Sequence, residues 1–336
     1  KLLEFNPCCA YAIGADFSGD KLLVVLMNSA GHVHSRTDIP LPNQEIYDVI
    51  YLTVDAIRTV IDAANVPVER IKAIGLSLPG LVDERQGVIW VARKTRWPQV
   101  PLTDELQKTF GLPVVCDKNA RAMAIGESWF GAGVGARNMA LLNIGLGVSA
   151  GIICENALVR GTSGLAGEVG HSSIVTDGPL CVCGKRGCLE ALASGPAIVA
   201  RARELMASGE PTTLATEDPA TLNAEAVARA AYAGDVLAQR VLQETATYIG
   251  IAVAGLVNLL NPELVILVGG VMRSGPLLLP RIYEVVKDIA HEELFLRTQI
   301  VLSKLGDEAA AIGAATHALL AVRLLPSRDG VDLKGL

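Results

Sequence analysis

The chain has 336 residues, of which 51% are hydrophobic, 19% charged and 4% aromatic, and its formal net charge is −6. A chain of this length can bury more than one core, and we expect two domains. The acidic balance and the few aromatic rings exclude a nucleic-acid groove in this segment, because such a groove needs clustered cations and stacking rings. The longest apolar stretch, residues 250–272, is interrupted by Asn258, Asn261 and Pro262, so we expect no membrane helix and a cytoplasmic protein.

Strands and helices alternate in the first part of the chain. Apolar runs at residues 11–14 and 22–27 flank the segment DFSGD at 16–20, which predicts two strands joined by a tight turn. The patterns that follow predict strands at 32–39, 71–78, 87–91 and 112–116 and helices at 45–64 and 119–129.

A second hairpin is predicted in the middle of the chain, where residues 138–144 and 149–154 flank Gly145-Leu146-Gly147. It resembles the first hairpin in outline, which suggests an ancient duplication within an α/β protein. Beyond it we expect helical stretches at 197–207 and 224–258, a buried strand at 264–268, a closing helix at 308–324 and one long polar loop at 208–223.

Four metal-ligand side chains crowd together beyond the second hairpin: His171, Cys181, Cys183 and Cys188. One imidazole and three thiolates form a tetrahedral ligand set for zinc, and because all four positions are filled the zinc would be structural. Gly184 and Gly187 allow the backbone to turn tightly enough for these ligands to converge. The alternative is a group of incidental buried cysteines.

Several motifs along the chain resemble those of the ROK family, the repressors, open reading frames and sugar kinases. They are SLPGLVD at 77–83, DKNA at 117–120, GE at 126–127, GEVGH at 167–171, CVCGKRGCLE at 181–190, VGG at 268–270 and GDEAAAIGAA at 306–315. The resemblance implies the actin-like ATPase fold, a duplicated ribonuclease H-like architecture whose two lobes have mixed sheets with flanking helices, a structural zinc loop and sugar in the cleft. The implied N-terminal lobe is 11–118 with 306–336, and the C-terminal lobe is 119–305 with the zinc loop at 171–190.

The resemblance also implies roles for individual residues. In the family's kinases the aspartate at the position of Asp117 is the general base that takes the proton from the sugar hydroxyl. The implied sugar-binding positions are Gly80, Cys116, Asp117, Glu168, His171 and Glu190, with His171 shared between sugar and metal. Two plainer roles remain open, because Asp117 could be a helix N-cap and Glu190 the partner of a cation on a helix face.

The chain departs from the kinase pattern at both implied phosphate turns. Asp20 replaces the threonine of the first turn, where a carboxylate would repel ATP, and Leu146 replaces the threonine of the second. Cys116 replaces an asparagine in the sugar site. Arg93 and Lys94 lie on the implied sugar loop, where they would either meet an anionic ligand or form a solvated basic loop.

The first ten residues resemble the linker that follows the winged helix-turn-helix of ROK repressors; the alternative is a random apolar extension. We therefore expect the effector-binding and oligomerisation domain of a transcriptional regulator without kinase activity. Its expected partners are a sugar or sugar derivative, a second copy or three further copies of the chain, and operator DNA reached through a segment absent from this chain. The alternatives are an ATP-dependent sugar kinase that uses Asp117 as base and a binding or structural zinc protein without regulatory output.

Overall fold

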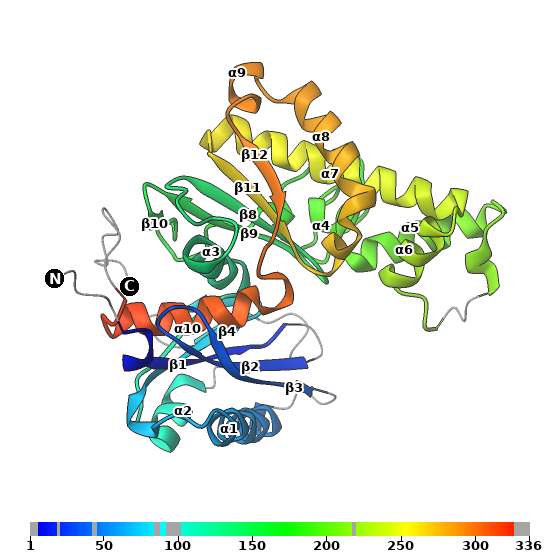
Figure 1. Cartoon of the computed structure of the whole chain (residues 1–336). Helices are drawn as coiled ribbons and strands as arrows, with labels where there is room; N and C mark the ends of the chain where they lie inside the picture. Colours follow the sequence, from blue (N-terminus) through cyan, green and yellow to red (C-terminus); the bar gives the residue numbers. More distant parts are fainter. Residues whose placement is uncertain are drawn as a thin grey trace. The chain divides into compact units, whose positions relative to one another are not determined.

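The computed structural model describes residues 6–18, 21–41, 46–83, 88–91, 102–216 and 220–325. It divides into two compact units, which are described separately (Figure 1). The first unit comprises Lys1–Arg137, Gly151–Ala166 and Ser303–Leu336, and the second comprises Asn138–Ala150 and Gly167–Leu302.

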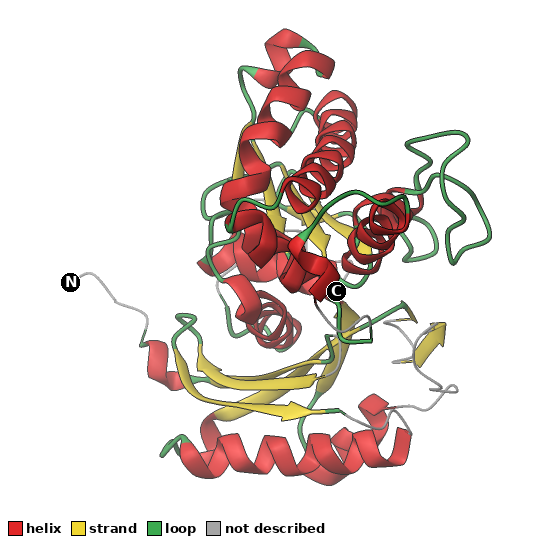
Figure 2. Cartoon of the chain, turned by 90° about the vertical axis from the view of Figure 1, so that its right-hand side faces the viewer, coloured by secondary structure: helices red, strands yellow, loops and turns green. Residues whose placement is uncertain are grey.

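The first unit is built on a five-stranded sheet of order β3-β2-β1-β4-β7. Its elements are β1 (Tyr11–Asp16), β2 (Lys21–Asn28), β3 (Val33–Pro40), α1 (Ile46–Ala63), β4 (Ile71–Leu78), α2 (Leu102–Phe110), β7 (Val114–Lys118), α3 (Asn119–Phe130) and α10 (Ala309–Ala321), with a small hairpin of β5 (Leu81–Asp83) and β6 (Val88–Val91). Residues of β1 alternate between the two faces, so that Ile13 packs with α1 and α2 while Ala12 packs with α10. The sheet is therefore covered on both faces, with α1 and α2 on one face and α10 on the other (Figures 1 and 2).

Helix α10 approaches the sheet closely enough to require glycine on the strands. A Cβ atom on Gly14 of β1 would lie 1.9 Å from the carbonyl oxygen of Ala311, and one on Gly75 of β4 would lie 1.9 Å from that of Ala314. This contact positions the start of α3, which packs against α10 and follows directly after Asp117.

The second sheet has the order β10-β9-β8-β11-β12. Its strands are β8 (Met139–Ile144), β9 (Val148–Cys154), β10 (Ala157–Leu158), β11 (Leu264–Val268) and β12 (Gln299–Leu302), and the helices of the second unit are α4 (Leu189–Ala193), α5 (Gly195–Ala207), α6 (Ala224–Tyr232), α7 (Val236–Leu260), α8 (Gly275–Ile289) and α9 (Glu292–Phe295). In the first sheet β3–β2 and β2–β1 pair antiparallel, whereas β1–β4 and β4–β7 pair parallel. In the second sheet β10–β9 likewise pair antiparallel at one edge, whereas β8–β11 and β11–β12 pair parallel. This repeated order is what an internal duplication produces.

Two details differ from the expectations. The helical stretch at 224–258 is two helices, because Gly234 takes a left-handed φ of 94° and the Asp235 side chain caps α7 by accepting from the Ala238 N–H. Helix α3 belongs to the first unit, where it packs against α10, although the expected lobe boundary precedes Asn119. Within the described ranges, the helices are too short or too polar to cross a bilayer.

Candidate functional site

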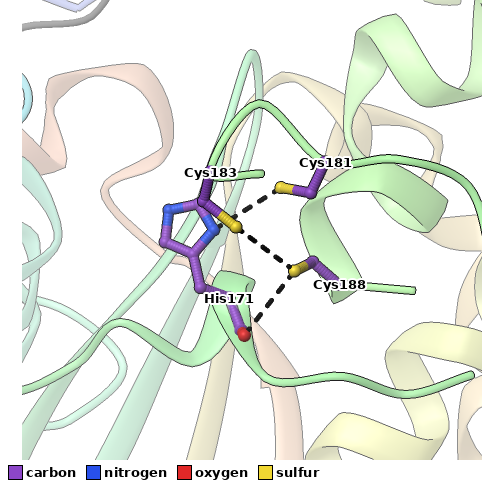
Figure 3. A group of neighbouring side chains, drawn as sticks. All are labelled: His171, Cys181, Cys183 and Cys188. Atoms are coloured by element: carbon purple, nitrogen blue, oxygen red, sulfur yellow. Dashed lines mark hydrogen bonds between the residues drawn. The ribbon is translucent and has the colours of Figure 1, made fainter. Parts of the chain in front are cut away.

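The four metal-ligand side chains lie together in the second unit (Figure 3). Their ligand atoms are all within 4.8 Å of one another. The Cys181 Sγ lies 3.7 Å from the His171 Nδ1, and the Cys183 Sγ lies 3.6 Å from the Cys188 Sγ. These separations are those of neighbouring corners of a small tetrahedron, so the cluster could hold a metal ion.

Local backbone bonds bring these ligands together. The Cys181 N–H donates to the Lys185 carbonyl at 2.7 Å, which folds residues 181–185 into a tight turn. Gly187 has a φ of 67°, and a Cβ there would lie 1.5 Å from the Val175 carbonyl oxygen, so only glycine fits. The turn returns the chain to Cys188, directly before α4.

The thiols of this cluster disfavour one another's ionisation. Burial, reinforced by the neighbouring thiols of Cys183 and Cys181, raises the pKa of Cys188 to about 12. Burial also raises the pKa of Cys181. Three thiolates at these distances need a cation among them, and a divalent metal supplies one.

Two further sugar-binding candidates border the metal cluster. The Glu168 Oε2 lies 3.9 Å from the His171 Nε2, the ring nitrogen opposite the one that faces Cys181. The Glu190 Oε2 accepts from the Val148 N–H at 3.0 Å, which ties the first turn of α4 to the start of β9. The Glu190 carboxylate therefore contacts the backbone of β9. Leu146, in the turn between β8 and β9, is 54% exposed.

Asp117, in the first unit, is the penultimate residue of β7 and lies among cationic side chains. Its Oδ1 accepts from the Lys118 N–H at 2.6 Å and from the Arg121 Nε at 2.5 Å, and its Oδ2 accepts from the Arg160 Nη1 at 3.2 Å. The Asp117 side chain is 0% exposed, that of Arg121 is 1% exposed and that of Arg160 is 17% exposed. Lys118 is the N-cap of α3, so Asp117 is not that helix's cap.

The surroundings of this group are strongly desolvated. Burial lowers the pKa of His317, in α10, to about 4; the Asp117 carboxylate opposes the shift, and both arginines add to it. Burial likewise lowers the pKa of Arg160 to about 10. Arg121 also donates to the Gly164 carbonyl at 2.8 Å, so it joins α3 to the loop that follows Arg160.

The remaining candidates are placed as follows. Gly80 has a left-handed φ of 85° directly after β4, and Cys116 is buried in β7. Asp20, Arg93 and Lys94 lie outside the described residues.

The sequence analysis missed both arginines at Asp117. The i,i+4 spacing of Asp117 and Arg121 at the start of a predicted helix could have revealed the first. Arg160 offers no comparable local signal, because it lies 43 positions further along the chain.

Known proteins similar to this chain fall into two classes. A family model described as ROK family matches residues 12–320. A glucokinase of Halalkalibacterium halodurans is 33% identical over 90% of this chain and 92% of its own length. A xylose repressor of Caldicellulosiruptor bescii is 32% identical over 93% of this chain and 79% of its own length.

Solved structures show the same division. A ROK family transcriptional regulator, a homologue of the E. coli MLC protein, has a TM-score of 0.83 and 30% identity over 93% of this chain and 78% of its own. A ROK glucokinase from Streptomyces griseus, in complex with glucose and AMPPNP, has a TM-score of 0.82 and 30% identity over 93% of this chain and 100% of its own. The expected actin-like fold with two mixed sheets is confirmed.

Proposed function

Because the chain belongs to the ROK family, we propose that it is the effector-binding and oligomerisation part of a transcriptional regulator and that it does not phosphorylate its sugar. The glucokinase and the xylose repressor are 33% and 32% identical to it, so overall similarity does not separate the two classes. The proposal rests instead on the state of Asp117.

Asp117 occupies the position of the kinase base, yet a guanidinium group lies on each of its oxygens. A general base needs an oxygen within reach of the hydroxyl that it deprotonates. In the chain without sugar, Asp117 is held as a buried anion between Arg121 and Arg160, and a hydroxyl can reach its Oδ2 only by displacing Arg160. The apolar Leu146 supports the same reading, because it offers no hydroxyl to a nucleotide phosphate.

The proposed effector is a sugar or sugar derivative, bound through the hydroxyl ligands that the family resemblance implies. The positions that the resemblance implies are Gly80, Cys116, Asp117, Glu168, His171 and Glu190. The sugar shifts the conformational population of a homodimer or homotetramer and thereby changes the operator affinity of a DNA-binding segment outside this chain.

The proposed metal is zinc. Zinc–sulfur bonds of about 2.3 Å in a tetrahedron place neighbouring sulfur atoms about 3.7 Å apart, which fits the observed 3.6 Å between Cys183 and Cys188. The protein supplies all four ligands, so the ion leaves no position for a catalytic water. Its role is to hold the loop between His171 and Glu190.

Calorimetry combined with a kinase assay tests the proposal. We expect glucose or xylose to bind in calorimetry, while a coupled assay with ATP and Mg²⁺ detects no ADP release. The Streptomyces griseus glucokinase, assayed in parallel, is the positive control. Turnover of either sugar, abolished by Asp117→Asn, would establish the alternative function, an ATP-dependent sugar kinase with Asp117 as its base.

A further inference from the structure

Asp117 is buried, and its two guanidinium partners differ in exposure. Asp117 accepts hydrogen bonds from the Lys118 backbone N–H, Arg121 and Arg160, and its side chain is 0% exposed. The Arg121 side chain is 1% exposed, whereas that of Arg160 is 17% exposed. The Arg160 side chain is therefore the more exposed of the two guanidinium side chains, although its Nη2 atom is buried.

The two ion pairs also differ in geometry. The Arg121 Nε lies 2.5 Å from Oδ1, and the same guanidinium donates to the Gly164 carbonyl through its Nη1, so Arg121 is held at two points. The Arg160 Nη1 lies 3.2 Å from Oδ2. A longer contact made by a partly exposed side chain is the weaker of the two and the easier to exchange.

We infer that Arg160 is a removable cover over Asp117, and that a sugar hydroxyl replaces its guanidinium at Oδ2 when the effector binds. The inference rests on the proposed function, since it concerns the same sugar site. A hydroxyl can donate to Oδ2, so the carboxylate stays hydrogen-bonded after the exchange. Oδ1 keeps its bonds from Arg121 and the Lys118 N–H throughout.

Desolvation supports the exchange. Burial lowers the pKa of Arg160 to about 10, which means that its cation is better solvated outside this position. Movement of Arg160 toward solvent relieves that cost while the sugar takes its place at Asp117.

The cover also connects the ligand to the backbone. Arg160 begins the loop that Arg121 fastens at Gly164, and the chain continues from this loop into Gly167 and Glu168. Exchange at Asp117 therefore releases a side-chain anchor between this loop and the residue that precedes Lys118, the N-cap of α3. A merely structural ion pair would have no such dependence on sugar.

Carboxylate labelling tests the cover without any sugar. The full chain is treated with a water-soluble carbodiimide and an amine, and Asp117 is followed by peptide mass spectrometry. We expect Asp117 to be unlabelled in the wild type and in Arg297→Ala, whose side chain is 73% exposed, but labelled in Arg160→Ala. Equal protection in Arg160→Ala would overturn the inference, provided that circular dichroism shows a folded variant.

Sugar affinity tests the exchange. A cover that is closed in nine molecules of ten weakens the apparent affinity about tenfold, so Arg160→Ala should bind glucose or xylose up to about tenfold more tightly in calorimetry. Arg160→Lys, which keeps the charge, should remain near the wild type. An unchanged or weaker affinity in Arg160→Ala overturns the inference and leaves the proposed function intact. Failure of both sugars to bind any form overturns the exchange together with the proposed function, whatever the labelling shows.

Discussion

At the scale of single residues, the buried ion pair of Asp117 and Arg121 is expected to contribute to the stability of the first unit. Replacement of Arg121 by Met leaves Asp117 buried with one guanidinium instead of two and removes the donor to Gly164. Because both side chains are almost fully buried, we expect Arg121→Met to lower the free energy of unfolding by about 3–5 kcal/mol. Urea denaturation of the wild type and the variant measures this difference in the free energy of unfolding.

A matched control is Arg297→Met, which removes an exposed ion pair with Glu293 and should cost less than about 1 kcal/mol. A loss equally small for Arg121→Met would contradict the buried position of the pair.

His317 gives a second prediction at this scale. Its pKa is lowered by burial from 6.5 to about 4, so between these pH values the unfolded chain binds a proton that the folded chain does not. The contribution of His317 to the free energy of unfolding is therefore fully present above about pH 6.5. It is lost as the pH falls toward 4, by about 3 kcal/mol in total.

The measurement is the free energy of unfolding against pH for the wild type and His317→Gln. The variant should lose less stability across this window, while His291→Gln, at an exposed histidine, should follow the wild type. Parallel curves for the wild type and His317→Gln would refute the prediction.

The metal cluster shows what could be predicted at the residue scale. Its four candidate ligands lie within one short segment of the chain, so their spacing alone predicted that these side chains come together. The partners of Asp117 depend on packing, because α10 positions α3 and a distant loop brings in Arg160. Local spacing can indicate Arg121, four residues after Asp117, but carries no information about Arg160.

At the scale of elements, Glu127 joins the end of α3 to two other segments of the first unit. It is fully buried, and its carboxylate accepts from the Ala132 N–H at 2.6 Å, the Ser303 Oγ at 2.5 Å and the Leu305 N–H at 2.9 Å. The segment that contains Ala132 lies just before the chain enters the second unit at Asn138. The segment that contains Ser303 and Leu305 begins where the chain returns to the first unit. One side chain thus anchors both segments.

We expect Glu127→Ala to destabilise the protein by about 3 kcal/mol, because it leaves several buried donors without an acceptor. Glu127→Gln should cost less, since the amide keeps one acceptor oxygen. Hydrogen exchange should rise at residues 131–133 and 303–306 in Glu127→Ala. Unchanged exchange there would show that other bonds hold these segments.

The metal loop is the second element with a testable role. We expect about one zinc per chain by plasma mass spectrometry, and chelation or Cys188→Ser should lower the melting temperature by about 10 °C or more, because structural zinc supplies folding free energy. The control is Cys9→Ser, at an exposed cysteine, which should retain both metal and stability. Less than half an ion per chain in the wild type, with Cys188→Ser as stable as the wild type, would exclude the site.

Elements with strong local patterns were predictable and weaker ones were not. The apolar runs of β1, β2 and β4 are buried strands, as expected. β12 is a short strand whose residues are half-buried or exposed, so its sequence shows no buried apolar run. Helix α8 has an apolar face but contains Pro280, a residue that argues against a helix interior. The break between α6 and α7 depends on the left-handed backbone conformation of Gly234. The spacing of apolar residues, which predicted one long helix, gives no sign of this conformation.

At the scale of the whole molecule, the two sheets repeat one strand order, which the paired glycine hairpins had suggested from the sequence. The same family architecture occurs in glucokinases and in repressors, so the fold does not choose between them. The proposed function rests on chemical features instead, namely the cations on Asp117 and the leucine in the second glycine turn.

The charge of the whole chain gives the last prediction. Protein–DNA affinity comes largely from cations that displace counterions from phosphates, and this chain carries a net charge of −6. We expect the 336-residue chain to show no sequence-specific binding in fluorescence anisotropy with the promoter of its own gene at about 150 mM salt. A polypeptide that adds a winged helix-turn-helix should bind a two-fold symmetric site, with sugar changing its affinity, because a symmetric dimer presents two reading helices. Specific binding by the 336-residue chain alone at this salt concentration would contradict the proposed division of labour, since the contacts to DNA would then have to come from these acidic units.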